Sequence, residues 1–170
     1  MKKLTVLFLA SAVTFLIACG GTQEKTTEPV VKKDFDTGLW VKTSNKQLDK
    51  IPVEGFAYKS SEVPAQKWDR WAKVAAPVVK KILDELPEGY VLEVRGHTDA
   101  RGPEEPVGNK PGNIKISRDR ARSVHTALRN NGITSPNLTY DGVGSAEPLS
   151  GIDPKSPDQR RVTFEVVPAR

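Results

Sequence analysis

Hydrophobic residues are unevenly distributed along this chain, and their spacing changes several times. At the N-terminus they form an uncharged run from Leu4 to Ile17, and a polar stretch rich in Thr, Glu and Lys follows. From about residue 51, apolar residues recur at intervals of two in some segments and of three and four in others. Intervals of two indicate strands, and intervals of three and four indicate helices. We therefore expect the folded domain to begin near Ile51.

Six segments of this region have the character of regular elements. In four of them apolar and polar residues alternate or strand-forming residues dominate, and these expected strands are 51–58, 90–96, 138–144 and 160–167. An apolar stripe predicts one helix over about 64–86, and a second from near Asn113 or Ser117 to Asn131. The order is βαβαββ. It predicts an α/β fold, an α+β sandwich in which the helices pack on one face of a mixed sheet.

Residues 1–18 have the features of a secretory signal peptide. Lys2 and Lys3 precede the apolar run, which is shorter than the roughly 20 residues that cross a bilayer. The run ends in Leu16-Ile17-Ala18-Cys19, which resembles the lipobox of bacterial lipoproteins, where the cysteine is lipidated and becomes the first mature residue. This ending favours a cleaved signal over the alternative, a short membrane anchor that stays attached.

The segment after the signal is expected to be a tether. The lipobox resemblance implies lipidation of Cys19, the only cysteine, and we expect the outer membrane because Gly20 is not the acidic residue associated with inner-membrane retention in some bacteria. Residues 19–50 then comprise the lipidated cysteine and a flexible tether, polar over most of its length. Leu39 to Val41 is apolar and is expected to pack on the domain as a short strand. The domain itself is expected to span residues 51–170.

Composition and charge narrow the class of partner. The chain has 170 residues and a formal net charge of +5, which cleavage after residue 18 lowers by two. Basic residues form no run and aromatic residues make up only 6%, so nucleic acid is a poor candidate partner. What remains is long enough for one domain and a tether.

A histidine, a hydroxyl and a carboxylate follow one another at His97 to Asp99, directly after an expected strand. Alone, this triplet is compatible with a metal site, part of a catalytic triad or a binding pocket. A zinc site needs three or four ligands, and His125 is the only other histidine. Ser117 and Ser145 could be nucleophiles, but no G-x-S-x-G segment is present. We therefore expect neither an enzyme nor a metal or cofactor site here, with His97 as a partly buried spacer.

Five ordered motifs make the chain resemble the OmpA-like peptidoglycan-binding domain, which also occurs in peptidoglycan-associated lipoproteins and flagellar stator proteins. They are VRGHTDARG (94–102), NIKISRDRARSV (113–124), NGI (131–133), LTYDGVGSAEPL (138–149) and QRRVTFEV (159–166). The resemblance covers about residues 53–167. It implies a mixed sheet with helices on one face, and non-covalent binding to the peptide stem of peptidoglycan.

The resemblance also implies a site. The family's ligand is the diamino acid of the stem, commonly meso-diaminopimelate, whose side-chain end carries an ammonium and a carboxylate on one carbon. Asp99 matches the family aspartate, and a carboxylate suits the ammonium. Arg120 matches the family arginine, whose planar fork suits the ligand carboxylate. We expect Asp99 and Arg120 near the surface, at a strand end and an early helical turn. Four more residues match positions that supply hydrogen bonds or line the pocket: Thr98, Asn113, Ile116 and Tyr58.

Three further features bear on this site. Arg160 and Arg161 are expected to have a structural role near the last strand, although the family places arginine near the ligand there too. The segment 103–113 is longer than the usual family loop and could reshape or cover the pocket. Lys59 stands where relatives often have an acid. If the stem contains ornithine in place of diaminopimelate, the second carboxylate is absent.

These observations predict a lipid-anchored protein of the outer membrane, with its domain facing the periplasm, that tethers the membrane to peptidoglycan. The alternative is a lipoprotein whose OmpA-like domain binds other envelope proteins. The two hypotheses differ in whether Asp99 and Arg120 converge on one pocket.

Overall fold

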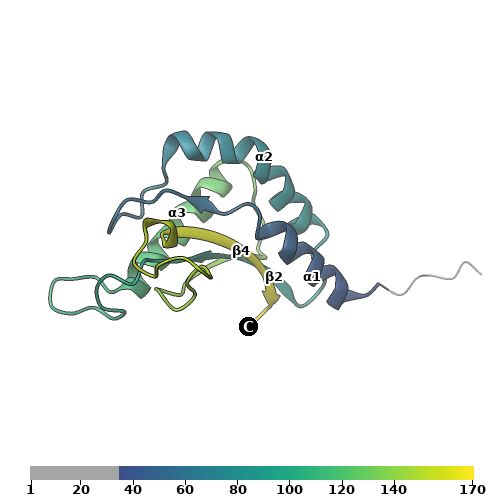
Figure 1. The fold of residues 1–170 in the computed structure, drawn as a ribbon. Coiled ribbons are helices and arrows are strands. Elements are labelled where there is room, and N and C mark those ends of the chain that lie inside the picture. Colours follow the sequence, from purple (N-terminus) through teal and green to yellow (C-terminus); the bar gives the residue numbers. More distant parts are fainter. Residues whose placement is uncertain (1–34) are drawn as a thin grey trace, which may run out of the picture. The chain divides into compact units, whose positions relative to one another are not determined.

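A four-stranded mixed sheet forms the centre of residues 35–170, the part of the chain that this computed structural model describes (Figure 1). Its strands are β1 (Val53–Glu54), β2 (Tyr90–Gly96), β3 (Leu138–Gly142) and β4 (Arg161–Pro168), in the spatial order β1-β4-β2-β3. β2 and β3 are parallel, whereas β4 is antiparallel to both β1 and β2. The signal segment, Cys19 and residues 20–34 of the expected tether lie outside the described residues.

Three helices cover one face of this sheet (Figure 1). They are α1 (Thr37–Leu48), α2 (Ala65–Asp84) and α3 (Asn113–Asn130), and a 3-10 turn (Pro157–Gln159) precedes β4. The buried side chains beneath the helices are Leu92 and Val94 of β2 and Val162, Phe164 and Val166 of β4. The alternate residues, among them Glu93, Arg95 and Glu165, form a charged cluster on the opposite face. The predicted α+β fold with a mixed sheet is therefore confirmed. No helix within residues 35–170 combines the length and the apolar character that crossing a membrane requires.

The apolar stripe of α2 packs against the sheet through two tryptophans. Trp71 stacks on Trp68 with ring centroids 5.0 Å apart, and on Phe164 of β4 at 5.3 Å. Its indole N–H donates to the carbonyl of Ile51 at 2.7 Å, which satisfies the one polar atom of the side chain. Both tryptophans therefore belong to the core.

Helix α1 replaces the short strand expected at Leu39 to Val41, and that prediction is wrong. The helix begins after Asp36, whose side chain accepts the backbone N–H of Leu39 at 2.9 Å, as an N-cap does. Ser44 and Leu48 are its buried residues. Residues 37–48, which the sequence analysis placed in the tether, thus pack on the domain.

Asn45 of α1 holds the helix against the edge of β4. Its side-chain oxygen accepts the N–H of Val166 at 2.7 Å, and its amide nitrogen donates to the carbonyl of Val166 at 3.2 Å. β1 pairs only with Arg161 and Val162, so this amide takes the place of a neighbouring strand further along β4.

The first strand is shorter than predicted because the chain turns away at Gly55. This glycine has a φ of 90°, a left-handed conformation that other residues rarely adopt. The chain then buries Phe56, which is 1% exposed, and passes over the beginning of α3 instead of continuing in the sheet.

Two glycines let α3 approach the carboxyl ends of β2 and β3 closely. Gly96 and Gly142 are direct partners in the parallel ladder. A Cβ atom at Gly96 would overlap the carbonyl of Ser117, and one at Gly142 would overlap the backbone of Arg118. The first half of α3 therefore packs closely against the carboxyl ends of β2 and β3, where a pocket forms.

Candidate ligand-binding site

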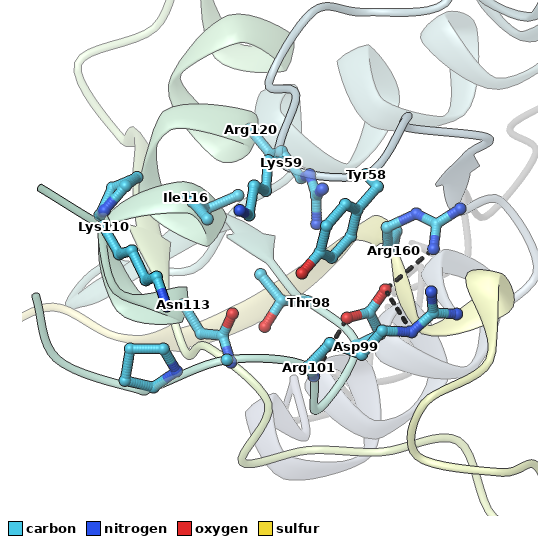
Figure 2. A pocket seen from close by; sticks show the side chains of 13 residues that line it. Tyr58, Lys59, Thr98, Asp99, Arg101, Lys110, Asn113, Ile116, Arg120 and Arg160 are labelled. Carbon is cyan, nitrogen blue, oxygen red and sulfur yellow. Dashed lines mark hydrogen bonds and ion pairs between the residues drawn. The ribbon is translucent and has the colours of Figure 1, made fainter. Parts of the chain in front are cut away.

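A pocket opens where the carboxyl end of β2 meets the first turns of α3 (Figure 2). All six residues predicted for the ligand site line it: Tyr58, Thr98, Asp99, Asn113, Ile116 and Arg120. Seven other residues complete the lining: Lys59, Arg101, Gly102, Pro103, Lys110, Pro111 and Arg160. Four separate parts of the chain therefore converge here. The predicted lipidation site, Cys19, lies outside the described residues.

Asp99 provides the one acidic side chain of the lining. It is only 2% exposed, and its Oδ2 accepts a hydrogen bond from Nη1 of Arg160 at 2.9 Å. Oδ1 accepts the backbone N–H of Arg101 at 3.2 Å. A buried carboxylate needs such partners to remain charged.

Arg120 projects from the second turn of α3 and is 1% exposed. Its guanidinium donates to three backbone carbonyls: those of Ser60 at 2.8 Å, His97 at 2.9 Å and Ala57 at 3.1 Å. The expectation that Asp99 and Arg120 lie near the surface is thus wrong. The segment after β1 crosses α3 here and covers the arginine, a long-range contact that neither residue's local sequence indicates.

Arg120 keeps its positive charge although the side chain is buried. Burial and the neighbouring cation Arg160 lower the pKa of Arg120 to about 10, while the carboxylate of Asp99 raises it. The side chain therefore remains protonated at neutral pH. Three of the five N–H groups of an arginine are used on the carbonyls, so two remain for a ligand.

Arg160 is the site residue whose position the sequence reasoning did not resolve. Its Nε donates to the carbonyl of Phe56 at 2.7 Å, and its Nη1 donates to Asp99, so that it lines the pocket as a second, partly buried cation. Arg161 instead donates to the carbonyls of Glu147 and Gln159, as the expected structural role requires. The adjacent arginines thus have different roles. The one sequence feature that pointed to Arg160 as a site residue was the family's arginine near the last strand.

Thr98 and Asn113 place polar groups on the pocket wall. The Thr98 hydroxyl is buried and has no hydrogen-bond partner within residues 35–170. Buried polar atoms are nearly always paired, so this hydroxyl is available to a ligand. Asn113 donates through Nδ2 to Glu104 at 3.1 Å, which leaves its side-chain oxygen as a possible acceptor.

The apolar part of the pocket consists of Ile116 and the ring of Tyr58. Ile116 is 8% exposed, whereas Tyr58 is 48% exposed and lies at the rim. The guanidinium of Arg101 lies 5.6 Å from the Tyr58 ring centroid, so a cation covers one part of the aromatic side chain. Figure 2 shows this ring between Asp99 and Ile116.

The segment 103–113 frames the pocket from the side of α3. The carbonyls of Pro103 and Glu104 accept the first N–H groups of the helix, from Asn113 and Ile114. The Glu104 carboxylate also bonds Ser145, and although burial raises its pKa, the bonds from Ser145 and Asn113 produce a net lowering. The outer part is a small hairpin, closed by the Val107–Lys110 bridge. Its role as a lid remains a prediction.

His97 does not line the pocket, although it precedes two residues that do. It is 2% exposed, and its Nε2 lies 2.8 Å from the hydroxyl of Thr163 on the neighbouring strand. Burial, together with Arg161 and Arg95, lowers the pKa of His97 to about 3, so the ring is neutral at physiological pH. Its burial is complete, not partial as expected.

Within the described part of the chain, no three His, Cys, Asp or Glu side chains are grouped as metal ligands would be.

The fold and the pocket define a small α+β domain with an open pocket at the carboxyl end of its parallel strands, in which most of the charged lining residues are basic. The chain belongs to the OmpA family, whose sequence profile matches residues 56–162. No sequence among the curated proteins matches it.

Two solved structures show the same fold. The peptidoglycan-associated lipoprotein from Burkholderia pseudomallei is 22% identical, with a TM-score of 0.54, and the match covers 75% of this chain and 99% of that one. The C-terminal domain of MotB from Helicobacter pylori is 18% identical, with a TM-score of 0.51, and the match covers 69% of this chain and 84% of that one. At these identities the likeness establishes the fold alone.

Proposed function

We propose that this chain is a lipid-anchored protein of the bacterial outer membrane that binds the peptide stem of peptidoglycan without catalysis, and so tethers the membrane to the wall. The observation that carries the proposal is the pocket that contains Asp99 together with Arg120 and Arg160. Membership of the OmpA family and the fold shared with a peptidoglycan-associated lipoprotein support it. The anchor is proposed from the lipobox-like ending at Cys19.

The pocket suits a ligand group that carries an ammonium and a carboxylate on the same carbon. Asp99 would accept from the ammonium, since its Oδ1 receives only one long hydrogen bond from the protein. Arg120 and Arg160 would donate to the carboxylate with the N–H groups that the protein leaves unused. The Thr98 hydroxyl would pair with either group, and Ile116 would contact the aliphatic chain.

Burial changes how we expect the site to work. The side chains of Asp99 and Arg120 are held by bonds to the protein before a ligand arrives. Less side-chain freedom is therefore lost on binding than at an exposed site, which favours affinity. Such a site discriminates by charge and geometry, because a mismatched ligand leaves buried groups unpaired.

A sedimentation assay of residues 20–170 on purified sacculi tests the proposal. Asp99→Asn keeps the shape of the side chain and an oxygen for Arg160, but removes the charge that would face the ammonium. Hydrogen bonds to charged groups contribute about 1.5–3 kcal/mol, so we expect affinity to fall about tenfold to over a hundredfold. Asp119→Asn is the matched control, because this half-exposed aspartate lies on the outer side of α3 and, within residues 35–170, forms an ion pair with Lys115 alone.

Circular dichroism of each variant separates lost recognition from unfolding. If folded Asp99→Asn binds sacculi as tightly as the unsubstituted chain, the pocket is not the peptidoglycan site. If the unsubstituted chain does not bind sacculi, the alternative of an adaptor for other envelope proteins replaces the proposal.

A further inference from the structure

The charges that line the pocket do not balance. Five of its lining side chains are basic and one, Asp99, is acidic. A single ammonium–carboxylate head group has no net charge and would leave this excess uncompensated. We therefore expect the rest of the ligand to carry negative charge. This inference rests on the proposed function of the pocket.

Three of the five cations already bond to the protein with part of their N–H groups. Arg160 pairs with Asp99, and Arg120 donates to three backbone carbonyls. Arg101 donates twice to the carbonyl of Lys155, at 3.0 and 2.7 Å, and lies 3.9 Å from Asp99. These contacts hold the three side chains in place whether or not a ligand is bound.

Lys59 and Lys110 are different. Both are exposed, and within residues 35–170 neither ammonium has a carboxylate within 4.0 Å or donates a side-chain hydrogen bond. In Figure 2 they lie on the side of Ile116 and Asn113, whereas Arg101 and Arg160 are gathered around Asp99 on the other side of Tyr58. The pocket thus has a second cationic region, separate from the region that holds Asp99.

The backbone at Lys59 is a second and independent observation. Lys59 has a φ of 58°, and it is the only non-glycine residue of the described chain with a positive φ. A lysine in this left-handed conformation is strained, and strain of this kind is concentrated at functional sites. A glycine would be relaxed here, but it would bring no ammonium to the pocket rim, where Lys59 Nζ lies 5.3 Å from the Tyr58 ring centroid.

We propose that Lys59 and Lys110 form a subsite for a second carboxylate of the stem peptide, outside the head group held near Asp99. The protein then prefers stems whose carboxylates are free over stems in which they are amidated. Exposed lysines are usually solvated charges of little consequence. These two differ because both face one pocket with an unmatched excess of positive charge.

The test compares two soluble probes by isothermal titration calorimetry with residues 20–170. One is a stem tetrapeptide containing meso-diaminopimelate with all carboxylates free, and the other has the same sequence with its C-terminal and glutamyl carboxylates amidated. We expect the free peptide to bind about three- to tenfold more tightly, a range typical of two partly exposed ion pairs. The preference should shrink as salt is added, because exposed charges are screened.

The double variant Lys59→Gln, Lys110→Gln should bind both probes alike, at the affinity of the amidated one. Lys73→Gln removes an exposed α2 lysine outside the pocket and should leave the preference intact. Lys59→Gly should reduce the preference while the melting temperature stays the same or rises, which a purely structural lysine would not do.

Equal binding of the two probes by the unsubstituted chain would overturn the inference, as would a preference that persists in the double variant. These results leave binding to sacculi intact, and the proposed function with it. If the unsubstituted chain binds neither sacculi nor the free peptide, the proposed function fails and the subsite falls with it.

Discussion

Replacing Arg120 with alanine should destabilise the domain considerably, although arginine is ordinarily a surface residue. The bond to the carbonyl of His97 is fully buried, whereas the carbonyls of Ser60 and Ala57 are accessible enough for water to replace the arginine. We count about 1.5–3 kcal/mol for the buried bond to a charged donor and roughly 0.5–1 kcal/mol for each of the others.

The cost of burying the guanidinium works against this sum. The bond values above are already net of much of the desolvation of donor and acceptor, so alanine recovers only the remainder of the cost of burying the charge. We therefore expect a net loss of about 2–4 kcal/mol in the free energy of unfolding. For a domain of this size, that corresponds to a melting temperature lower by roughly 10 °C.

Thermal and urea denaturation followed by circular dichroism measure this difference. Arg118→Ala is the control, because Arg118 lies two residues earlier on α3, is 57% exposed, and pairs with Asp141 at 2.7 Å. A surface pair contributes about 0–1 kcal/mol, so this variant should melt close to the unsubstituted chain. If the two variants melt within about 2 °C of one another, the bonds from Arg120 do not stabilise the fold as argued.

Three further predictions concern other parts of the chain. Cys19→Ala should leave an unprocessed or soluble form in cell fractionation, and the lipobox interpretation fails if the variant is processed and partitions with membranes as before. Deleting residues 106–109, the exposed outer hairpin, should weaken binding to sacculi more than it lowers the melting temperature, and the reverse result would make the segment structural. The folded-state pKa of His97, about 3, is below its ordinary 6.5, so its contribution to stability is complete above pH 6.5 and is lost as the pH falls toward 3. About 2 kcal/mol is lost by pH 5, and melting curves of His97→Gln between pH 7 and 4.5 should show a flatter dependence.

The spacing of apolar residues was sufficient for the sheet and the two longer helices. It failed at α1, where three consecutive apolar residues from Leu39 to Val41 suggested a strand. The helical signal was nevertheless present, since Val41, Ser44 and Leu48 are three and four residues apart and Asp36 is a capping residue. The first strand was predicted too long because the left-handed turn at Gly55 ends it.

The residues that form the site could be predicted from the sequence, but their burial could not. The motifs around Asp99 and Arg120 placed both in a site, and the structure places both in one pocket. Their burial depends on the chain from Phe56 to Ser60, which is distant in sequence and carries no pattern that indicates where it lies. Arg160 was ambiguous for the same reason, since only the start of β4 determines which of two adjacent arginines reaches Asp99.

The amide of Asn45 has a practical consequence for shortening this chain. A chain that begins at residue 51, where the apolar pattern begins, lacks α1 and this amide. The N–H and C=O of Val166 would then lie on an uncovered sheet edge, free to pair with the same edge of another molecule. Such a fragment should therefore self-associate as its concentration rises, whereas one that begins before Asp36 should stay monodisperse in light scattering.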